Sequence, residues 1–206
     1  MPASRSILVF LSGLVAGAAI LGAARFVAMP PADDVVHYHA NWAVMLDGER
    51  LDLSSDRYME DVAGCRADPS RVMPRDRVHM HGNDHDAVHV HAAGATWGHL
   101  LANLGFGIGD DYLVTDEGVR HESGSAGTLE FILNGQRVPS IRNRLIQSRD
   151  RLLISYGPEP VDEVIRTQFP RVASTAERLN SLPDPATCSG PAGETTRDRL
   201  RRAFWF

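Results

Sequence analysis

Three short stretches of this chain alternate histidine with other residues, and this two-residue period is the pattern of a β-strand. They are "HYH" at residues 37–39, "VHMH" at 78–81 and "VHVH" at 88–91. Since residues two apart in a strand project from the same face, each stretch carries its histidines on one face. In the second and third stretches the opposite face is apolar. The pattern therefore predicts a sheet with an imidazole-covered face above a hydrophobic core.

The density of histidine indicates metal binding. Folding residues 79–91 back about His85 places His81 opposite His89 and His79 opposite His91, at the roughly 4.5–5.5 Å Cβ spacing of cross-strand neighbours. Imidazoles at this spacing can bind one ion through bonds of about 2.0–2.1 Å. A merely solvated face would carry Thr, Ser, Lys or Gln at some of these positions, and none occurs. The predicted metal ligands are His37, His39, His79, His81, His89 and His91.

The expected metal is one divalent transition ion, because imidazole nitrogen suits several of these ions. Zn(II) or Cu(II) fits an all-imidazole set best, and Fe(II) would fit if a carboxylate joined it. A group of neighbouring imidazoles without an ion would instead form a pH-sensitive face, since histidine titrates near pH 6.5. Further candidate ligands, each with a turn or helix role as the alternative, are His85, His99, Asp84 and Asp86.

The N-terminal residues form a separate segment. Residues 6–24 carry no charge and follow Arg5. As a helix, these nineteen residues span roughly 28 Å, close to the ~30 Å hydrocarbon thickness of a bilayer. A cleaved signal peptide usually has a shorter apolar core, although the small residues before Arg25 keep cleavage open. We expect a single-pass signal anchor in the inner (cytoplasmic) membrane, with the bulk of the chain on the periplasmic side.

The rest of the chain predicts an α+β fold, with a mixed-sheet domain containing β-hairpins and with helices near the C-terminus. The pairs Asp47-Gly48 and Asn134-Gly135 each follow an apolar run and indicate hairpin turns. Helices are expected over residues 54–64 and from Thr96 to Gly105. The predicted segments are an anchor at 1–29, a linker at 30–34, the His-rich extracytoplasmic domain at 35–157, a helical segment at 158–182 and an irregular tail at 183–206.

Two resemblances add to this reading. From residue 95 to 157, the order of helix, strand, Asn-Gly hairpin and final strand resembles part of the β-grasp (ubiquitin-like) fold. The stretches "HYHANWAV", "VHVHAAGATWGHLLANLG" and "DRLLISYG" resemble an uncharacterised group of membrane-anchored prokaryotic proteins with repeated H-x-H strands. The second resemblance implies a membrane-anchored protein and no particular activity.

The two cysteines, Cys65 and Cys188, lie far apart in the sequence. Their spacing excludes the C-x-x-C redox motif and a cysteine zinc knuckle. Outside the cytoplasm such a pair predicts one disulfide, whereas in the cytosol two free buried thiols would be the alternative.

The C-terminal stretch "RDRLRRAFWF" combines arginines with apolar residues. A helix of this composition can lie on a membrane surface or in the groove of a partner. The residues expected to make this contact are Leu200, Phe204, Trp205 and Phe206.

Composition and motifs narrow the function. A net charge of -5 with no dense basic stripe argues against nucleic-acid binding. The sequence has no G-x-S-x-G, H-E-x-x-H or P-loop motif, so it favours binding over catalysis. The expected function is a metal-binding accessory subunit of a larger membrane complex, respiratory or photosynthetic. The alternatives are a mononuclear His-ligated metalloenzyme and a purely structural subunit with no bound metal.

Overall fold

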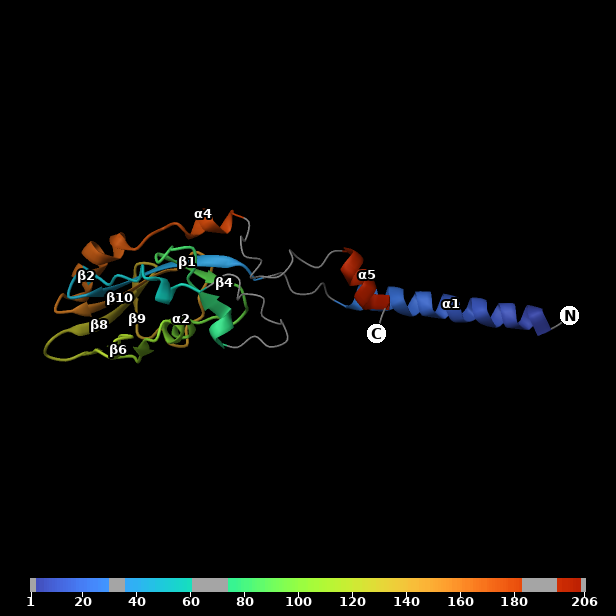
Figure 1. Ribbon diagram of the computed structural model, residues 1–206, viewed down its shortest axis with the longest axis horizontal. Coiled ribbons are helices and arrows are strands. Elements are labelled where there is room, and N and C mark those ends of the chain that lie inside the picture. Colours follow the sequence, from blue (N-terminus) through green and yellow to red (C-terminus); the bar gives the residue numbers. More distant parts are fainter. Residues whose placement is uncertain (1–2, 30–35, 61–73, 183–195, 205–206) are drawn as a thin grey trace. The chain divides into compact units, whose positions relative to one another are not determined.

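The computed structural model describes residues 3–29, 36–60, 74–182 and 196–204 (Figure 1). These residues belong to two compact units, a larger one over Val36–Gly190 and a smaller one formed by the two ends of the chain. The predicted α+β class, with an N-terminal apolar helix, a mixed sheet and C-terminal helices, is confirmed. The predicted disulfide and the contacts of Trp205 and Phe206 lie outside the described residues and stay predictions.

The larger unit is built on a seven-stranded mixed sheet in the order β3-β4-β1-β10-β8-β9, with β2 also paired to β1. The pairing of β1 with β10 is parallel, and the other strand pairs of this sheet are antiparallel. The strands are β1 (Tyr38–Leu46), β2 (Glu49–Arg50), β3 (Val78–His79), β4 (Ala87–Val90), β8 (Thr128–Leu133), β9 (Gln136–Val138) and β10 (Arg151–Gly157). A second, three-stranded sheet contains β5 (Gly107–Ile108), β6 (Tyr112–Val114) and β7 (Arg120–Glu122).

Both predicted Asx-Gly hairpins are confirmed. Asp47 and Gly48 have φ angles of 51° and 80°, and Asn134 and Gly135 have 53° and 82°. Positive φ at both central residues defines the type I′ turn, whose twist matches that of the flanking strands. These turns connect β1 to β2 and β8 to β9.

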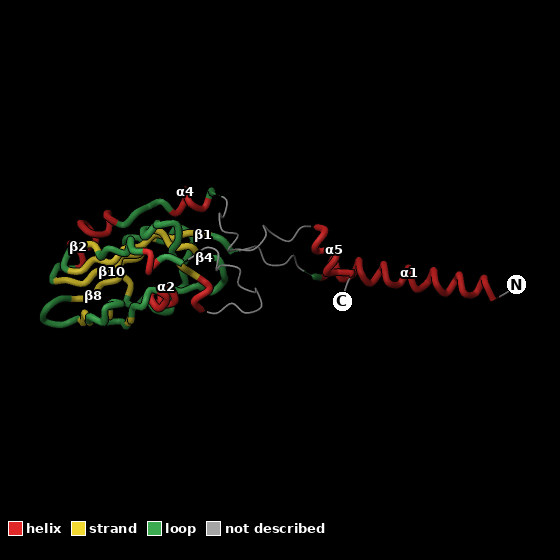
Figure 2. The backbone as a smooth tube through the Cα atoms, viewed as in Figure 1, coloured by secondary structure: helices red, strands yellow, loops and turns green. Residues whose placement is uncertain are grey.

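Helical segments lie on both sides of the main sheet (Figure 2). The two faces of this sheet carry separate hydrophobic cores. Even-numbered residues of β1, among them Trp42 and Val44, belong to the larger core together with the helix α2 (Trp97–Asn103). The odd-numbered Ala43 and Met45 belong to a smaller core, completed by the segment that follows β10. Since His39 and Asn41 continue the odd-numbered series, the histidine face of β1 is the polar extension of this smaller core.

The segment after β10 is helical but interrupted, and Pro170 lies within its 3-10 turn. It contains α3 (Val161–Glu163), a π-helical turn at Val164–Gln168, a 3-10 turn at Phe169–Arg171 and α4 (Ala176–Asn180). By contrast, the helix predicted over residues 54–64 is wrong for the described part of that stretch. Only a single 3-10 turn forms there, at Asp56–Tyr58, and the Ser55 side chain makes no capping bond.

Asn41 ties α4 to the sheet and is itself buried, with 1% of its surface exposed. Its Nδ2 donates to Asp86 O and to Thr175 Oγ1, both at 2.9 Å, and its Oδ1 accepts from Ala176 N at 2.9 Å. Leaving any of these polar atoms without a hydrogen bond inside the protein would cost free energy of folding.

We therefore expect Asn41→Ala to lower the free energy of unfolding by about 2–3 kcal/mol, as the loss of buried hydrogen bonds usually does. Urea unfolding followed by circular dichroism measures this change. The exposed Asn143 provides the matched control, because Asn143→Ala removes an amide that lies at the surface. Equal stability of the two variants would contradict the role given to Asn41.

The smaller unit contains α1 (Ala3–Ala28) and α5 (Thr196–Phe204). Within α1, Val9–Ala28 is long and apolar enough to cross a membrane, and a signal sequence would meet the same criterion. Arg199 of α5 donates to the carbonyl oxygens of Phe26 and Met29 at 2.8 and 3.0 Å. Its guanidinium also lies 4.3 Å from the Phe26 ring centroid. Arg199 thus caps carbonyls at the C-terminus of α1 and places its positive charge where the helix dipole favours it.

Candidate metal centre

Three histidines form a row across the edge of the sheet. In the strand register His89 of β4 lies opposite His79 of β3 on one side and opposite His39 of β1 on the other. The predicted third strand beside the histidine hairpin is therefore confirmed. The apolar residues of the same strands face the larger core, also as predicted, and are fully buried: Val78, Met80, Val88 and Val90.

The predicted pairing of the hairpin is wrong by two residues. Its register is Val78 with Val90 and His79 with His89, not His79 with His91. The connection from β3 to β4 contains Gly82 and Asn83, both at positive φ, and it does not fold symmetrically about His85. Because the shift is an even number of residues, the histidines keep their common face.

The histidines still meet as diagonal neighbours. His81 Nε2 lies 2.7 Å from His89 Nδ1, and His91 Nε2 lies 3.1 Å from His79 Nδ1. Two nitrogens on a tetrahedral ion with bonds of about 2.0–2.1 Å are about 3.3 Å apart. The first pair therefore has the spacing of a hydrogen bond and must open by roughly half an ångström to admit an ion.

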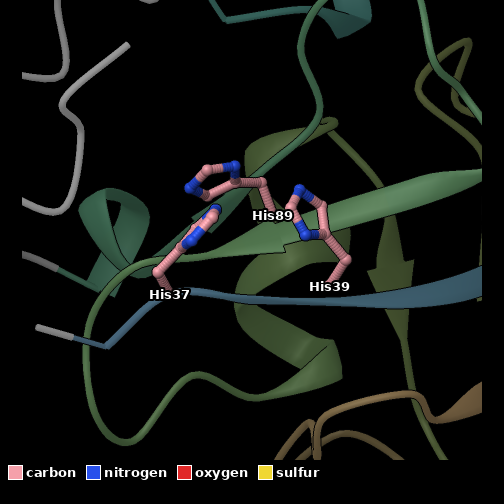
Figure 3. A group of neighbouring side chains, drawn as sticks. All are labelled: His37, His39 and His89. Atoms are coloured by element: carbon pink, nitrogen blue, oxygen red, sulfur yellow. The ribbon is translucent and has the colours of Figure 1, made fainter. Parts of the chain in front are cut away.

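Two groups of three histidines could each hold a metal ion. One group is His37, His39 and His89, and the other is His79, His81 and His89, with the nitrogens of each group within 4.8 Å of one another. Figure 3 shows the first group, in which the rings of His39 of β1 and of His37, just before β1, approach the ring of His89. The ring centroids of His37 and His39 lie 4.8 and 4.9 Å from that of His89. His89 thus belongs to both groups.

Burial distinguishes this cluster from an ordinary polar surface. His39, His79 and His89 are 7%, 3% and 1% exposed. The Nε2 atoms of His37 and His89 are both buried and have no hydrogen-bond partner among the described residues. A buried polar atom without a partner carries a desolvation cost that a bound ion would offset.

Asn180 of α4 is far from His39 in the sequence, but its side chain orients the His39 ring. Its Oδ1 accepts from the backbone N of His39 at 2.6 Å and lies 3.0 Å from His39 Nδ1. The backbone N–H can only donate, so the amide oxygen faces His39 and also accepts from Nδ1–H. This bond places the lone pair of His39 on Nε2, the arrangement by which an outer hydrogen bond orients a metal-ligating histidine.

Glu60 has the corresponding position beside His79. Its Oε2 lies 3.1 Å from His79 Nδ1, and its carboxylate is 45% exposed. A carboxylate that accepts from Nδ1–H leaves the lone pair of His79 on Nε2. Glu60 and His79 also line a cavity of about 220 Å³, together with Tyr58 and Asn103. The sequence carries no signal for Glu60 or Asn180, since neither belongs to a histidine stretch.

The further candidate ligands lie outside both groups. His99 is part of the N-terminal cap of α2, where its Nδ1 accepts from Thr96 N at 3.2 Å and its backbone N donates to Thr96 Oγ1 at 3.1 Å. Asp86 forms an ion pair with Arg50, and its backbone N–H donates to Asp84 Oδ1 at 3.1 Å. His85 Nε2 is 3.8 Å from Asp86 Oδ1. The fourth predicted histidine of the hairpin, His91, contacts His79 without joining either group.

The buried position of His89 strongly affects its protonation. Burial lowers the pKa of His89 to about 2, and the neighbouring imidazoles of His79, His39, His81 and His37 contribute in the same direction. In an unfolded chain the pKa of histidine is near 6.5. Between these two values the unfolded state binds a proton that the folded state does not, so acid favours unfolding.

We therefore expect the contribution of His89 to the stability of the metal-free protein to be full above pH 6.5 and to be lost progressively as the pH decreases toward 2. His89 contributes a slope of up to about 1.4 kcal/mol per pH unit, or roughly 2 kcal/mol between pH 6.5 and pH 5. Urea unfolding at a series of pH values in the presence of a chelator measures it. His89→Gln should reduce this slope by up to about 1.4 kcal/mol per pH unit, the effect of one proton. Val88→Ala should not change the slope. An unchanged slope in His89→Gln would contradict this assignment.

Comparison with protein-family models, with curated proteins and with solved structures finds no match for this chain. The resemblances to the β-grasp fold and to membrane proteins with H-x-H strands therefore stay predictions. The geometry of the histidine groups and the long apolar helix α1 are the observations on which a function must rest.

Proposed function

We propose that this protein is a membrane-anchored metal-binding subunit that serves a larger membrane complex, respiratory or photosynthetic, from the extracytoplasmic side. The observation that carries the proposal is the burial of His39, His79 and His89 within groups of converging imidazoles. Burying imidazoles side by side is unfavourable without donors for their lone pairs. The buried Nε2 atoms of His37 and His89 have no hydrogen-bond partner among the described residues. A divalent ion bound there would offset the cost of burying them and stabilise the cluster.

The donor set defines the class of metal. All five residues of the two groups offer imidazole nitrogens, which favours Zn(II) or Cu(II) over Mg(II) or Ca(II). Fe(II) fits if a carboxylate approaches, and Glu60 is the acid beside the cluster. Asp84 and Asp86, the acids suggested by the sequence, are engaged within their own turn and with Arg50.

The smaller unit supports the proposed membrane anchor and the proposed partner. The side chains along α1 are largely exposed, as those of a helix surrounded by lipid would be: Ile7, Val9, Phe10, Leu11, Leu14, Val15, Ile20, Leu21 and Val27. On α5, Leu200 and Phe204 are 43% and 46% exposed, which leaves apolar surface for a membrane or for a partner subunit. Arg5 before the apolar run favours a cytoplasmic N-terminus and hence an extracytoplasmic domain.

Elemental analysis tests the metal-binding proposal. The full-length protein is extracted from membranes in mild detergent and purified without a His-tag or a nickel column. We expect zinc or copper at one or two ions per chain, and copurification of other membrane subunits. Protein that contains no metal, and that binds neither Zn(II) nor Cu(II) in equilibrium dialysis, would contradict the proposal.

A second candidate function is a mononuclear metalloenzyme. It is favoured by one observation, the cavity of about 220 Å³ that places Glu60 and Tyr58 beside His79. A catalytic metal site has three protein ligands, an open position and a nearby acid or base, and Glu60 could fill the last role. Substitution with Co(II) distinguishes the candidates. Added azide should change the visible spectrum of the cobalt protein if a coordination position is open, and should leave it unchanged in a closed structural site.

A further inference from the structure

His89 occupies the middle position of the histidine cluster. It is the residue of β4 that faces His79 on one neighbouring strand and His39 on the other, and its ring centroid lies 5.2 and 4.9 Å from theirs. The two groups of three histidines therefore lie on opposite sides of one shared ring.

The two nitrogens of His89 have different surroundings. Nδ1 lies 2.7 Å from His81 Nε2, within the second group. Nε2 is buried and has no hydrogen-bond partner among the described residues, and the same is true of His37 Nε2 in the first group. The lone-pair directions of the two nitrogens of an imidazole diverge, so they cannot bind the same ion. Both groups can be filled together only if each ion takes a different nitrogen of His89.

We propose that His89 bridges two divalent transition-metal ions. Its Nε2 binds one ion together with His37 and His39. Its Nδ1 binds the other ion together with His79 and His81. This inference rests on the proposed metal-binding function and specifies that the site holds two ions. A neutral imidazole carries one N–H proton, which leaves to solvent when the second ion binds, so that His89 bridges as an imidazolate. No oxidation or reduction is involved.

The surroundings are arranged for two ions. Asn180 contacts Nδ1 of His39 and Glu60 contacts Nδ1 of His79, so each group has one ligand oriented from outside. The carboxylate of Glu60 also offsets part of the added positive charge. His37 and His81 are only partly buried, so each ion retains a side that solvent can reach.

Copper loading of the full-length protein tests the bridge. Metal-free protein is titrated with Cu(II), the bound copper is counted by elemental analysis, and the spins are counted by electron paramagnetic resonance. We expect two copper ions per chain, with a spin count well below two because the imidazolate couples the two ions antiferromagnetically. His37→Gln and His81→Gln should each bind one copper ion with a full spin count. His121→Gln, on β7, is the matched control and should behave as the unmodified protein does.

Each other outcome has a defined meaning. One copper ion per chain in the unmodified protein would overturn the bridge and leave the proposed metal-binding function intact. Two ions with a full spin count would also overturn it, because the ions would then be uncoupled. Binding of no copper or zinc at all would contradict the proposed function itself. Circular dichroism confirms that each variant is folded before its metal content is compared.

Discussion

Replacing His89 with alanine should remove bound metal from the protein. His89 is shared by both groups, so the substitution leaves only two histidines in each. Loss of an outer hydrogen-bond partner of a metal ligand already weakens binding by about 10–100-fold, and loss of a ligand common to both groups should exceed this. A competition titration with a chromophoric chelator measures the metal affinity of the unmodified protein. We expect metal binding by His89→Ala to be too weak to detect in the same titration.

Val88→Ala provides the matched control. Val88 immediately precedes His89 in β4. Its side chain points to the opposite face, into the larger core, where it is fully buried. Its truncation should lower the free energy of unfolding by roughly 2 kcal/mol and leave metal affinity nearly unchanged. Equal loss of metal in both variants would indicate that β4 is merely destabilised, and retention of metal by His89→Ala would contradict the assignment of its ligands.

Introducing two aspartates at Leu14 and Val15 should prevent α1 from inserting into a membrane. Both side chains are mostly exposed in α1 and lie within Val9–Ala28. A charged residue near the centre of a transmembrane helix costs on the order of 3 kcal/mol, so the two together outweigh the apolar contribution of several leucines. The unmodified protein should stay in the membrane pellet after carbonate extraction, and the double variant should not.

The double variant Leu14→Val, Val15→Leu is its control, because it exchanges the side chains and keeps the helix apolar. It should remain in the pellet. N-terminal sequencing of the mature protein checks the alternative of a cleaved signal. Mature protein that begins after Ala24 and stays soluble would show that the segment is not an anchor.

What the sequence could predict was set by local geometry. The alternation of valine and histidine was enough to assign faces, because a strand places residues two apart on the same side whatever its partner. The two Asx-Gly turns were predictable for a similar reason, since few other residue pairs accept positive φ twice in succession. Thr96 likewise lies at the start of the expected helix, as the N-cap of α2, with its hydroxyl accepting from His99 N at 3.1 Å.

The contacts that orient the ligands could not be read in the same way. His39 and Asn180 meet although 141 positions separate them, and only the packing of α4 on β1 brings them together. Glu60 lies in a stretch whose composition indicated a helix, whereas the described residues there form one 3-10 turn and an extended connection. The register of β3 with β4 depends on the conformation of the turn between them, which the alternation of side chains does not determine.

The parallel pairing of β1 with β10 affects the order in which the chain can assemble. Asn41 pairs with Arg151, so the centre of the sheet cannot close until almost the whole domain has been synthesised. Pairings between residues so distant in sequence form slowly, because a long loop must be closed first. The antiparallel pairing of β1 with β4 needs the chain only as far as Val90. His37, His39 and His89 can therefore come together in a nascent chain, and an ion bound there would hold β1 in place until β10 arrives.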